Sequence, residues 1–431
     1  MDASQTDLTP GEIIGHVDCH SAYVSMHRVF EPKLIGKPVC VLSSNDGAVV
    51  SRSDEAKRLG VKISQPAFEL RDLVDRHGLI LRSSNFPLYD CCSNRVMKAI
   101  SECVPEMAVH SVDEAWVRLS GMRGNLEEIG RQIQASVLKK TGIPTGVGIS
   151  RNKTTAKLCN WASKKWKVKT GSVVALIERE RFEKLLDYAP ASEVWGIGAR
   201  LTEHLSALNI TTAGQLSRAD PTFIRKHLGV TVERTVHELN WRQCFGFGEA
   251  PGPRKTLAST RSFGRRIRDL HSLEVAICFH SAKLCLKLRK QGSLASAVRV
   301  FINTSVFATI DARQNKSAGA VFIRPTSDTR EFTEAAILLL RGIYRDGFDW
   351  AKAGIIVTET VSETGYIRDI FAPPERPKSA QLMKTIDTIN RLGGPGTVRF
   401  GREPANRQLG VKHEFPSPKA TTSWGEIINV K

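Results

Sequence analysis

Acidic residues at the ends of apolar, strand-like segments constrain this chain more than any other feature. The apolar run at residues 13–17 has the pattern of a strand that ends at Asp18. Asp113 and Glu114 lie between two further strand-like segments, MAVHSV and AWVRLSG. A charge in an apolar setting is normally paired, neutralised or bound to a metal ion. We therefore expect these three carboxylates to face a positively charged partner.

The segments around these acids predict a mixed α+β domain. Helical spacing of apolar residues covers residues 22–30 and 126–140, and Pro32 is expected to stop the first of these helices. The segments KPVCVL, AVVS and TGVGIS have strand-like composition, and Ser53 precedes a short helical stretch that it can cap. Strands that carry carboxylates at their ends and are backed by helices predict an α+β core.

A cluster of carboxylates of this kind suits magnesium, which prefers hard oxygen ligands and keeps positions free for water and phosphate. Two such ions can activate a 3′-hydroxyl and stabilise a leaving triphosphate oxygen, which is nucleotidyl transfer. The alternative is that Asp18 caps the following helix and that Asp113 and Glu114 form a solvated turn. The residues alone do not decide between these interpretations.

The charge balance favours a polyanionic partner. The chain has 62 Lys and Arg against 44 Asp and Glu, a net charge of +18. Residues 151–170 hold seven of the cationic residues and no acidic one, so this segment is a candidate phosphate-facing surface. Nucleic acid is therefore the partner that we expect, although many basic proteins bind none.

Other function classes are disfavoured by composition. The nine cysteines include no C-x-x-C pair, so neither a zinc site nor a disulfide framework is expected. No apolar run approaches the roughly 18 residues that a membrane-spanning helix requires. The polar, acidic start MDASQTDLTPGE lacks the features of an export signal, which predicts a cytoplasmic protein.

Length predicts two to four domains, because 431 residues exceed what one hydrophobic core organises. The Pro-containing stretches EAPGPRKT and FAPPERPKS are expected linkers, and the segment VWGIGARL resembles the turn of a helix-hairpin-helix element. A basic α/β module is expected between the two linkers. The tail after the second linker is too weakly patterned to assign.

Several separated motifs, in order, resemble the UmuC group of Y-family DNA polymerases. They are HVDCHSAYVS, KPVCVLSSNDGAVVSRSDEAKRLGVK, SSNFPLYDCCSNRVMKAI, HSVDEAW, TGVGISRNKTTAKLCNWASKKW, EVWGIGARL, FIRKHLGVTVERTVHEL and STRSFGRRI. A weaker similarity continues to the final TTSWGEIINVK. The resemblance implies an α+β multidomain right-hand polymerase with the following parts: a polar tail (1–12), a ferredoxin-like palm (13–178) with small fingers inserted at about 31–88, a helix-hairpin-helix thumb (179–248), an α/β little finger (256–371) and a UmuC-type C-terminal region (376–431).

The resemblance also implies roles for individual residues. Asp18 and Asp113 would bridge two Mg²⁺ ions, Glu114 would complete the primer-side ion, and the Cys19 carbonyl would be a further ligand. Tyr23 matches the steric gate that excludes a ribose 2′-hydroxyl, although on its own it would be read as a core aromatic. The remaining implied contacts are Lys57 and Lys164 for the triphosphate, and Lys153, Gly196, Gly198, Arg261, Arg265, Arg266 and Arg268 for DNA. For the arginines the alternative is a solvated run of charge.

The chain departs from the family at several positions. His27 stands where an acid is usual, Ala22 where an aromatic is usual, Arg118 where an acid commonly follows the DEA motif, and Asp54 where a tyrosine is frequent. The segment IRDIF, residues 367–371, aligns with the sliding-clamp motif but lacks its glutamine, so clamp binding is uncertain. These departures bear on efficiency and lesion preference more than on the reaction class.

The implied function is error-prone translesion synthesis in the SOS response to DNA damage. Its substrates would be primer-template DNA and deoxynucleoside triphosphates, and its partners a UmuD-like processed subunit and RecA. Two alternatives stay open at this point. One is a polymerase-shaped accessory protein that binds DNA but is catalytically weak, and the other is an unrelated two-metal nuclease that uses the same carboxylates.

Overall fold

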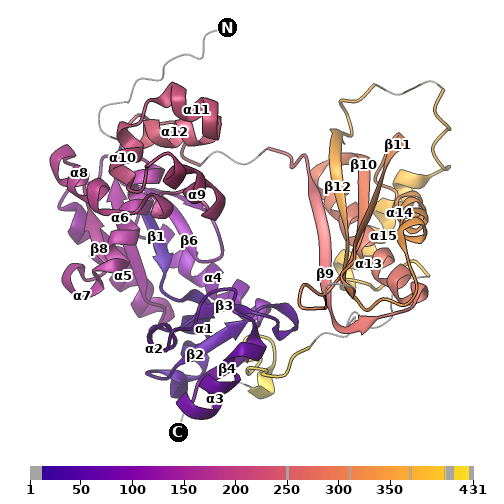
Figure 1. Ribbon diagram of the computed structural model, residues 1–431, viewed down its shortest axis with the longest axis horizontal. Helices are drawn as coiled ribbons and strands as arrows, with labels where there is room; N and C mark the ends of the chain where they lie inside the picture. Colours follow the sequence, from indigo (N-terminus) through magenta and orange to yellow (C-terminus); the bar gives the residue numbers. More distant parts are fainter. Residues whose placement is uncertain are drawn as a thin grey trace. The chain divides into compact units, whose positions relative to one another are not determined.

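The computed structural model describes residues 12–248, 252–309, 312–367, 369, 371–401, 403 and 412–426. Its contacts divide the chain into two compact units, which Figure 1 shows in ribbon form. Unit 1 contains Met1–Glu249 and Glu414–Lys431, and unit 2 contains Ala250–His413. The polar tail expected at 1–12 lies outside the described residues except for Glu12.

A five-stranded sheet of order β5-β6-β1-β7-β8 forms the centre of unit 1. Its strands are β1 (Ile14–Cys19), β5 (Glu106–Val109), β6 (Glu114–Arg118), β7 (Thr145–Ser150) and β8 (Val173–Ala175). Strand β1 pairs antiparallel with β6 on one side and β7 on the other. All residues of β1 and β7 are buried, as befits inner strands of a sheet that is covered on both faces.

Helices cover both faces of this sheet. The helices α4 (Phe86–Ser101) and α5 (Leu126–Thr141) pack on one face, in a core that includes Val17 and Val147. Helix α6 (Lys153–Lys165) crosses the other face so closely that a Cβ atom on Gly148 would lie 2.1 Å from the Asn160 backbone nitrogen. Only glycine fits at that crossing, and it lets α6 hold its lysines over the ends of β1 and β6.

A smaller sheet of order β3-β2-β4 follows helix α1 (Ala22–Phe30). Its strands are β2 (Val39–Leu42), β3 (Val49–Arg52) and β4 (Ile80–Ser83), and the short helices α2 (Asp54–Arg58) and α3 (Arg71–His77) lie in the connection from β3 to β4. The predicted cap of α2 is confirmed, because the Ser53 hydroxyl accepts a hydrogen bond from the Ala56 N–H at 3.1 Å. Strand β4 is an edge of this sheet, which matters for the C-terminal segment described below.

The rest of unit 1 up to residue 248 is mainly helical. It comprises α7 (Lys167–Thr170), α8 (Arg179–Tyr188), α9 (Ala199–Ala207), α10 (Ala213–Arg218), α11 (Pro221–Leu228) and α12 (Val230–Leu239). Leu158 and Ala162 of α6 belong to the same core as Leu185 and Val236, so these helices are packed onto α6. The buried carboxylate of Glu238 accepts hydrogen bonds from three backbone N–H groups, which fixes α12 to the start of α6.

Unit 2 is a four-stranded antiparallel sheet of order β11-β10-β12-β9 with two helices packed against one face. The strands are β9 (Leu257–Ile267), β10 (Ser293–Thr304), β11 (Asn315–Thr326) and β12 (Trp350–Ser362), and the helices are α13 (Leu270–Gln291) and α14 (Thr329–Ile343). A further helix, α15 (Ser379–Leu392), forms in the tail that the sequence left unassigned.

All nine cysteines are free thiols, in agreement with the expectation of no disulfide framework. Within the described ranges, no helix is long and apolar enough to cross a membrane.

Candidate active site

The register of the central sheet brings Asp18 and Glu114 together. Asp18 of β1 is the direct partner of Glu114 of β6, and the next N–H along β1, that of Cys19, donates to the Asp113 carbonyl at 3.0 Å. One side-chain ligand atom each from His16, Asp18 and Glu114 lies within 4.8 Å of the others. Two of the three acids singled out in the sequence are therefore neighbours at one sheet position.

Asp113 lies in the turn that leads into β6, beside these two residues. Its carboxylate accepts a hydrogen bond from the Ser111 hydroxyl at 2.6 Å. The same hydroxyl oxygen accepts hydrogen bonds from the backbone N–H groups of Asp113 and Glu114 at 3.3 and 3.2 Å. The turn is thus held by Ser111. In this arrangement the Asp113 carboxylate is not part of the three-residue cluster formed by His16, Asp18 and Glu114.

Two lysines of α6 neutralise the two clustered acids. The Lys164 Nζ lies 2.6 Å from Asp18 Oδ1, and the Lys157 Nζ lies 3.0 Å from both carboxylate oxygens of Glu114. The two lysines are seven residues apart, which places them on one face of the helix. Lys164 was predicted from the sequence as a triphosphate ligand, whereas Lys157 was missed, although this spacing could have indicated it.

The two carboxyl groups titrate as a pair with opposite shifts. Burial raises the pKa of Asp18 above its ordinary value, although the Lys164 ammonium opposes this effect. Burial also acts to raise the pKa of Glu114, but the hydrogen bond from Asp18 and the charge of Lys157 outweigh it, so this pKa is lowered. Such a pair shares a proton readily, and a divalent cation would favour the form in which both groups are charged.

His16 is a second residue that the sequence did not predict. Its ring is buried, contacts the Trp116 ring with centroids 4.4 Å apart, and places Nε2 3.8 Å from Glu114 Oε1. Burial lowers the pKa of His16 to about 3, so the imidazole is neutral. Its position two residues before Asp18 on the same strand face was the signal available in the sequence.

The residues present fit a hard divalent cation. Asp18 and Glu114 supply carboxylate oxygens, and Asp113 supplies another from the adjoining turn. Burial raises the pKa of the Cys19 thiol, so its sulfur stays protonated and the backbone carbonyl is the ligand that this residue can offer. The donor set is therefore rich in oxygen, with one neutral nitrogen at its side.

Comparison with known proteins agrees with this geometry. Residues 17–160 match the impB/mucB/samB family, residues 254–369 match the impB/mucB/samB family C-terminal domain, and residues 380–430 match a domain of unknown function, DUF4113. The chain is 38% identical to the protein UmuC of Salmonella typhimurium over 96% of this chain and 99% of that protein. It is 39% identical to SamB of the same species over 96% of this chain and 98% of SamB. The chain belongs to the impB/mucB/samB family of UmuC-type Y-family DNA polymerases.

A solved structure supports the same fold. A Y-family DNA polymerase chimera of Dbh and Dpo4 aligns with a TM-score of 0.63 at 22% identity, covering 80% of this chain and 98% of that chain. After the parts of the Y-family fold, we call the five-stranded sheet the palm, the sheet β3-β2-β4 the fingers, the helices α8–α12 the thumb and the sheet of unit 2 the little finger. As a member of this family, the chain is a DNA-directed DNA polymerase of translesion synthesis in SOS mutagenesis.

The expected steric gate, Tyr23, lies on the helix that follows the Asp18 strand. It is half-buried and stacks on Tyr89 of α4 with ring centroids 4.1 Å apart. The Tyr89 hydroxyl is 2.8 Å from His27 Nε2, so a hydrogen bond from α1 holds this pair in place. Tyr89 is thus another residue of the site that sequence reasoning missed.

Lys57 of the fingers forms an ion pair with Asp54. The Lys57 Nζ lies 2.8 Å from Asp54 Oδ1, and the Lys167 Nζ lies 3.4 Å from Asp54 Oδ2. Asp54 therefore pairs with two lysines, Lys57 of its own helix and Lys167. All three side chains are about half exposed, so the charges are partly screened by water.

The residues expected to contact DNA are dispersed over the polymerase. Lys153 donates to the Gly246 carbonyl, Gly196 has a left-handed φ of 91°, and Gly198 directly precedes α9. In the little finger Arg265 and Arg266 are exposed. The clamp-like segment 367–371 is described only in part, because residues 368 and 370 lie outside the described residues.

Two of the four arginines expected to bind DNA do not present a free, fully exposed charge. Arg261 is half-buried and shares the strand face of Leu257, Ser259 and Phe263, which are buried against the helices. Arg268 pairs with Asp349 through both carboxylate oxygens. Of the four arginines, Arg265 and Arg266 therefore present the most accessible charge.

Proposed function

We propose that Asp18, Asp113 and Glu114 hold two Mg²⁺ ions for template-directed nucleotidyl transfer. The observation that carries this proposal is the register that sets Asp18 opposite Glu114, with the Asp113 turn beside them. The bound ions would supply activation of the primer 3′-hydroxyl and charge stabilisation of the triphosphate. The Cys19 carbonyl would be a further ligand.

The lysines of α6 have a second role in this proposal. Lys157 and Lys164 pair with Glu114 and Asp18 and so keep the buried carboxylates compensated. Lys164 is 38% exposed, so its ammonium can turn from Asp18 toward an incoming triphosphate. Lys57 of the fingers would bind the same triphosphate. The protein thus exchanges internal ion pairs for contacts with substrate.

The remaining residues would select the sugar of the nucleotide and bind the DNA. Tyr23, braced by Tyr89, would block the space beside C2′ of the sugar. Lys153, Gly196, Gly198, Arg261, Arg265, Arg266 and Arg268 would contact the DNA backbone without reading sequence. The partners proposed from the family are primer-template DNA, deoxynucleoside triphosphates, a UmuD-like processed subunit and RecA, in the cytoplasm and at the nucleoid when active. A sliding clamp is not included, because residues 367–371 lack the expected glutamine.

One experiment separates this proposal from its alternatives. The purified chain is incubated with an end-labelled primer-template, Mg²⁺ and the four deoxynucleotides, beside an Asp18→Asn variant. Extension of the label by the wild type alone is expected. Shortening of the label would indicate a nuclease, and binding without extension by either protein would indicate an accessory role.

A further inference from the structure

The fingers carry a docking surface at the free edge of their sheet. Strand β4 is an edge strand, and such an edge offers unpaired backbone groups to another segment. Here the Ser83 N–H donates to the Phe415 carbonyl at 2.8 Å, and the Phe415 N–H donates to the Ser83 hydroxyl at 3.1 Å. The segment that covers this edge therefore comes from the C-terminal end of the same chain, drawn in yellow beside β4 in Figure 1.

Contacts on both sides of Phe415 fix this segment in one register. The Glu414 N–H donates to Asp46 Oδ2 at 2.7 Å, and the Asn85 side-chain amide donates to the Ser417 hydroxyl at 3.0 Å. The Phe415 ring packs against the buried fingers core. Phe415 and Ser417 each precede a proline, which restricts both residues to extended backbone and lowers the entropy cost of docking.

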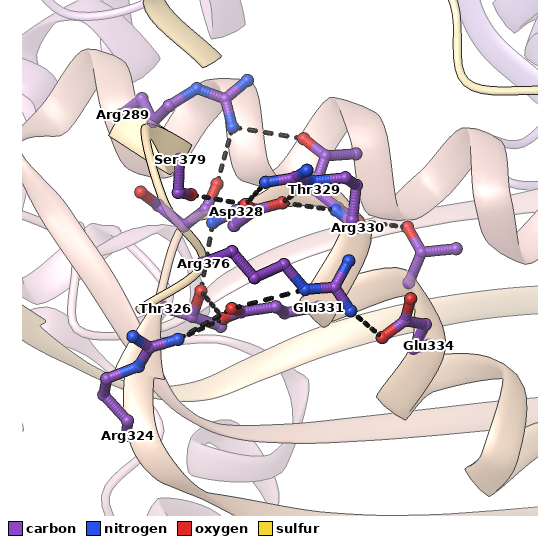
Figure 2. Close-up of polar contacts among 12 residues, drawn as sticks. Arg289, Arg324, Thr326, Asp328, Thr329, Arg330, Glu331, Glu334, Arg376 and Ser379 are labelled. Carbon is purple, nitrogen blue, oxygen red and sulfur yellow. Dashed lines mark hydrogen bonds and ion pairs between the residues drawn. The ribbon is translucent and has the colours of Figure 1, made fainter. Parts of the chain in front are cut away.

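The other end of the C-terminal region is fixed to the little finger. Arg289 of α13 makes a two-pronged contact with Asp387 of α15, at 2.7 and 2.8 Å, and these side chains are 16% and 26% exposed. Paired, partly buried contacts of this kind are among the stronger ion pairs. Figure 2 shows the adjoining contacts, in which Ser379 bonds to Asp328 and Arg376 reaches Glu334 at 2.7 Å. Helix α15 is thereby a fixed part of the little finger.

We propose that the C-terminal region is a strap that ties the little finger to the fingers through the docking of residues 414–418 on β4. The chain passes between the two units once near residue 250 and again near residue 413, so unit 2 is attached at both ends. The residues from Leu392 to Glu414 span at most about 75 Å when extended, which limits how far the little finger can move. The kind of partner that this surface fits is an extended, proline-containing segment with one aromatic side chain.

The second attachment to unit 1 restricts the motion of the little finger. A domain held by one flexible linker samples a large volume, and a second attachment raises its effective concentration near the surface to which it is tied. If the little finger binds the duplex, as the proposed function has it, the strap limits how far this DNA-binding surface can move from the fingers during lesion bypass. That consequence rests on the proposed function, whereas the strap itself does not.

Hydrogen exchange and small-angle scattering on the full-length chain without DNA test the strap. Phe415→Ala removes the ring that fills the fingers surface, and Trp424→Ala, which removes an 89% exposed aromatic of the same segment, is the matched control. We expect exchange in the peptide that contains Ser83 to accelerate at least tenfold in Phe415→Ala, with an increased radius of gyration. Trp424→Ala should leave both at wild-type values.

A second variant opens the strap at its other end. Asp387→Ala removes the partner of Arg289, so the radius of gyration should increase while exchange at Ser83 stays slow. The proposal would be overturned if Phe415→Ala kept the wild-type exchange rate at Ser83 and the wild-type radius of gyration. An unchanged radius of gyration in Asp387→Ala would overturn it as well. Because neither measurement involves polymerisation, failure of the active-site proposal would leave this test intact.

Discussion

The ring of Tyr23 stacks on the ring of Tyr89, with centroids 4.1 Å apart and planes inclined by 15°. Tyr89 is 1% exposed and is held in turn by the hydrogen bond between its hydroxyl and His27. Because the Tyr23 side chain is already held by this stacking, it loses little further conformational entropy when a nucleotide binds. Aromatic pairs of this kind stabilise a fold by about 0.5–1.5 kcal/mol beyond the contribution of the buried area. The gate expected from the sequence is thus braced from behind by a residue of another helix.

Tyr23→Ala is expected to admit ribonucleotides. Removing the ring opens space beside the sugar, and discrimination in kcat/KM between deoxy- and ribonucleotides should fall on the order of 10-fold to 200-fold, as for other steric pockets. Single-nucleotide insertion kinetics measure this ratio. Tyr188→Ala, which removes a 58% exposed tyrosine from α8, should leave it unchanged. Unchanged discrimination in Tyr23→Ala would make this tyrosine an ordinary packing residue.

Asp113→Ala is expected to abolish Mg²⁺-dependent primer extension while DNA affinity stays within a few-fold of wild type. The carboxylate would bind metal, whereas the basic surfaces would bind the duplex. Primer extension on a gel and fluorescence anisotropy with the same duplex measure the two properties. Asp187→Ala, at an exposed acid that pairs with Arg218 on the thumb, is the matched control and should extend normally. Extension near the wild-type rate by Asp113→Ala would end the two-metal assignment.

The three acids could be predicted from the sequence because each lies beside an apolar, strand-like segment, where a charged side chain is unusual. Asp18 follows the mostly apolar run at residues 13–17 near the end of β1, and this run is buried in the fold because β1 is the central strand. His16 and Lys157 were not predicted, because His16 reaches Glu114 through the pairing of β1 with β6 and Lys157 reaches it where α6 crosses the sheet at Gly148. Both contacts join segments far apart in the sequence, so local spacing shows which face His16 and Lys157 share with Asp18 and Lys164 but not that this face meets Glu114.

The C-terminal region was not predicted for a different physical reason. Helix α15 buries one apolar residue deeply, Met383, and is otherwise fixed by polar contacts such as Arg289 with Asp387. Its apolar residues Leu382, Met383, Ile386 and Ile389 have helical spacing, as in the predicted α5, but the contacts that fix the helix join polar residues far apart in the sequence. For the same reason the stretch FAPPERPKS has the composition of a linker, although its Arg376 pairs with Glu331 and Glu334.

His27 is expected to lower the free energy of unfolding of unit 1 at acidic pH. Burial lowers the pKa of His27 from 6.5 to about 4, so the unfolded chain binds a proton more readily than the folded one. The stability is complete above pH 6.5 and is lost as pH falls from 6.5 toward 4, by about 3 kcal/mol in total. Urea unfolding at pH 7 and pH 5 should show a smaller pH dependence for His27→Gln than for wild type. Equal dependence in both proteins would contradict a neutral, buried imidazole.

Asp54→Ala is expected to improve nucleotide binding. Asp54 accepts contacts from Lys57 and Lys167 at 2.8 and 3.4 Å, and its pKa is lowered chiefly by the hydrogen bond from Lys57, so it is charged at neutral pH. Two unit charges 4 Å apart interact by about 1 kcal/mol in water and about 4 kcal/mol at an effective dielectric of 20. Because these side chains are about half exposed, the lower figure applies more closely.

Removing Asp54 frees both ammonium groups for an anionic ligand, whereas the chemistry at Asp18 is untouched. The KM for the nucleotide should therefore fall by up to roughly tenfold with little change in kcat, which is the mark of altered uniform binding. Steady-state insertion kinetics measure both constants. Asp72→Ala removes a comparable acid that pairs with Arg76 on α3 and should change neither. The competing explanation is that Asp54 only stabilises the first turn of α2, by about 0.3–1 kcal/mol. An unchanged KM together with a slightly lower melting temperature would support that explanation and exclude ours.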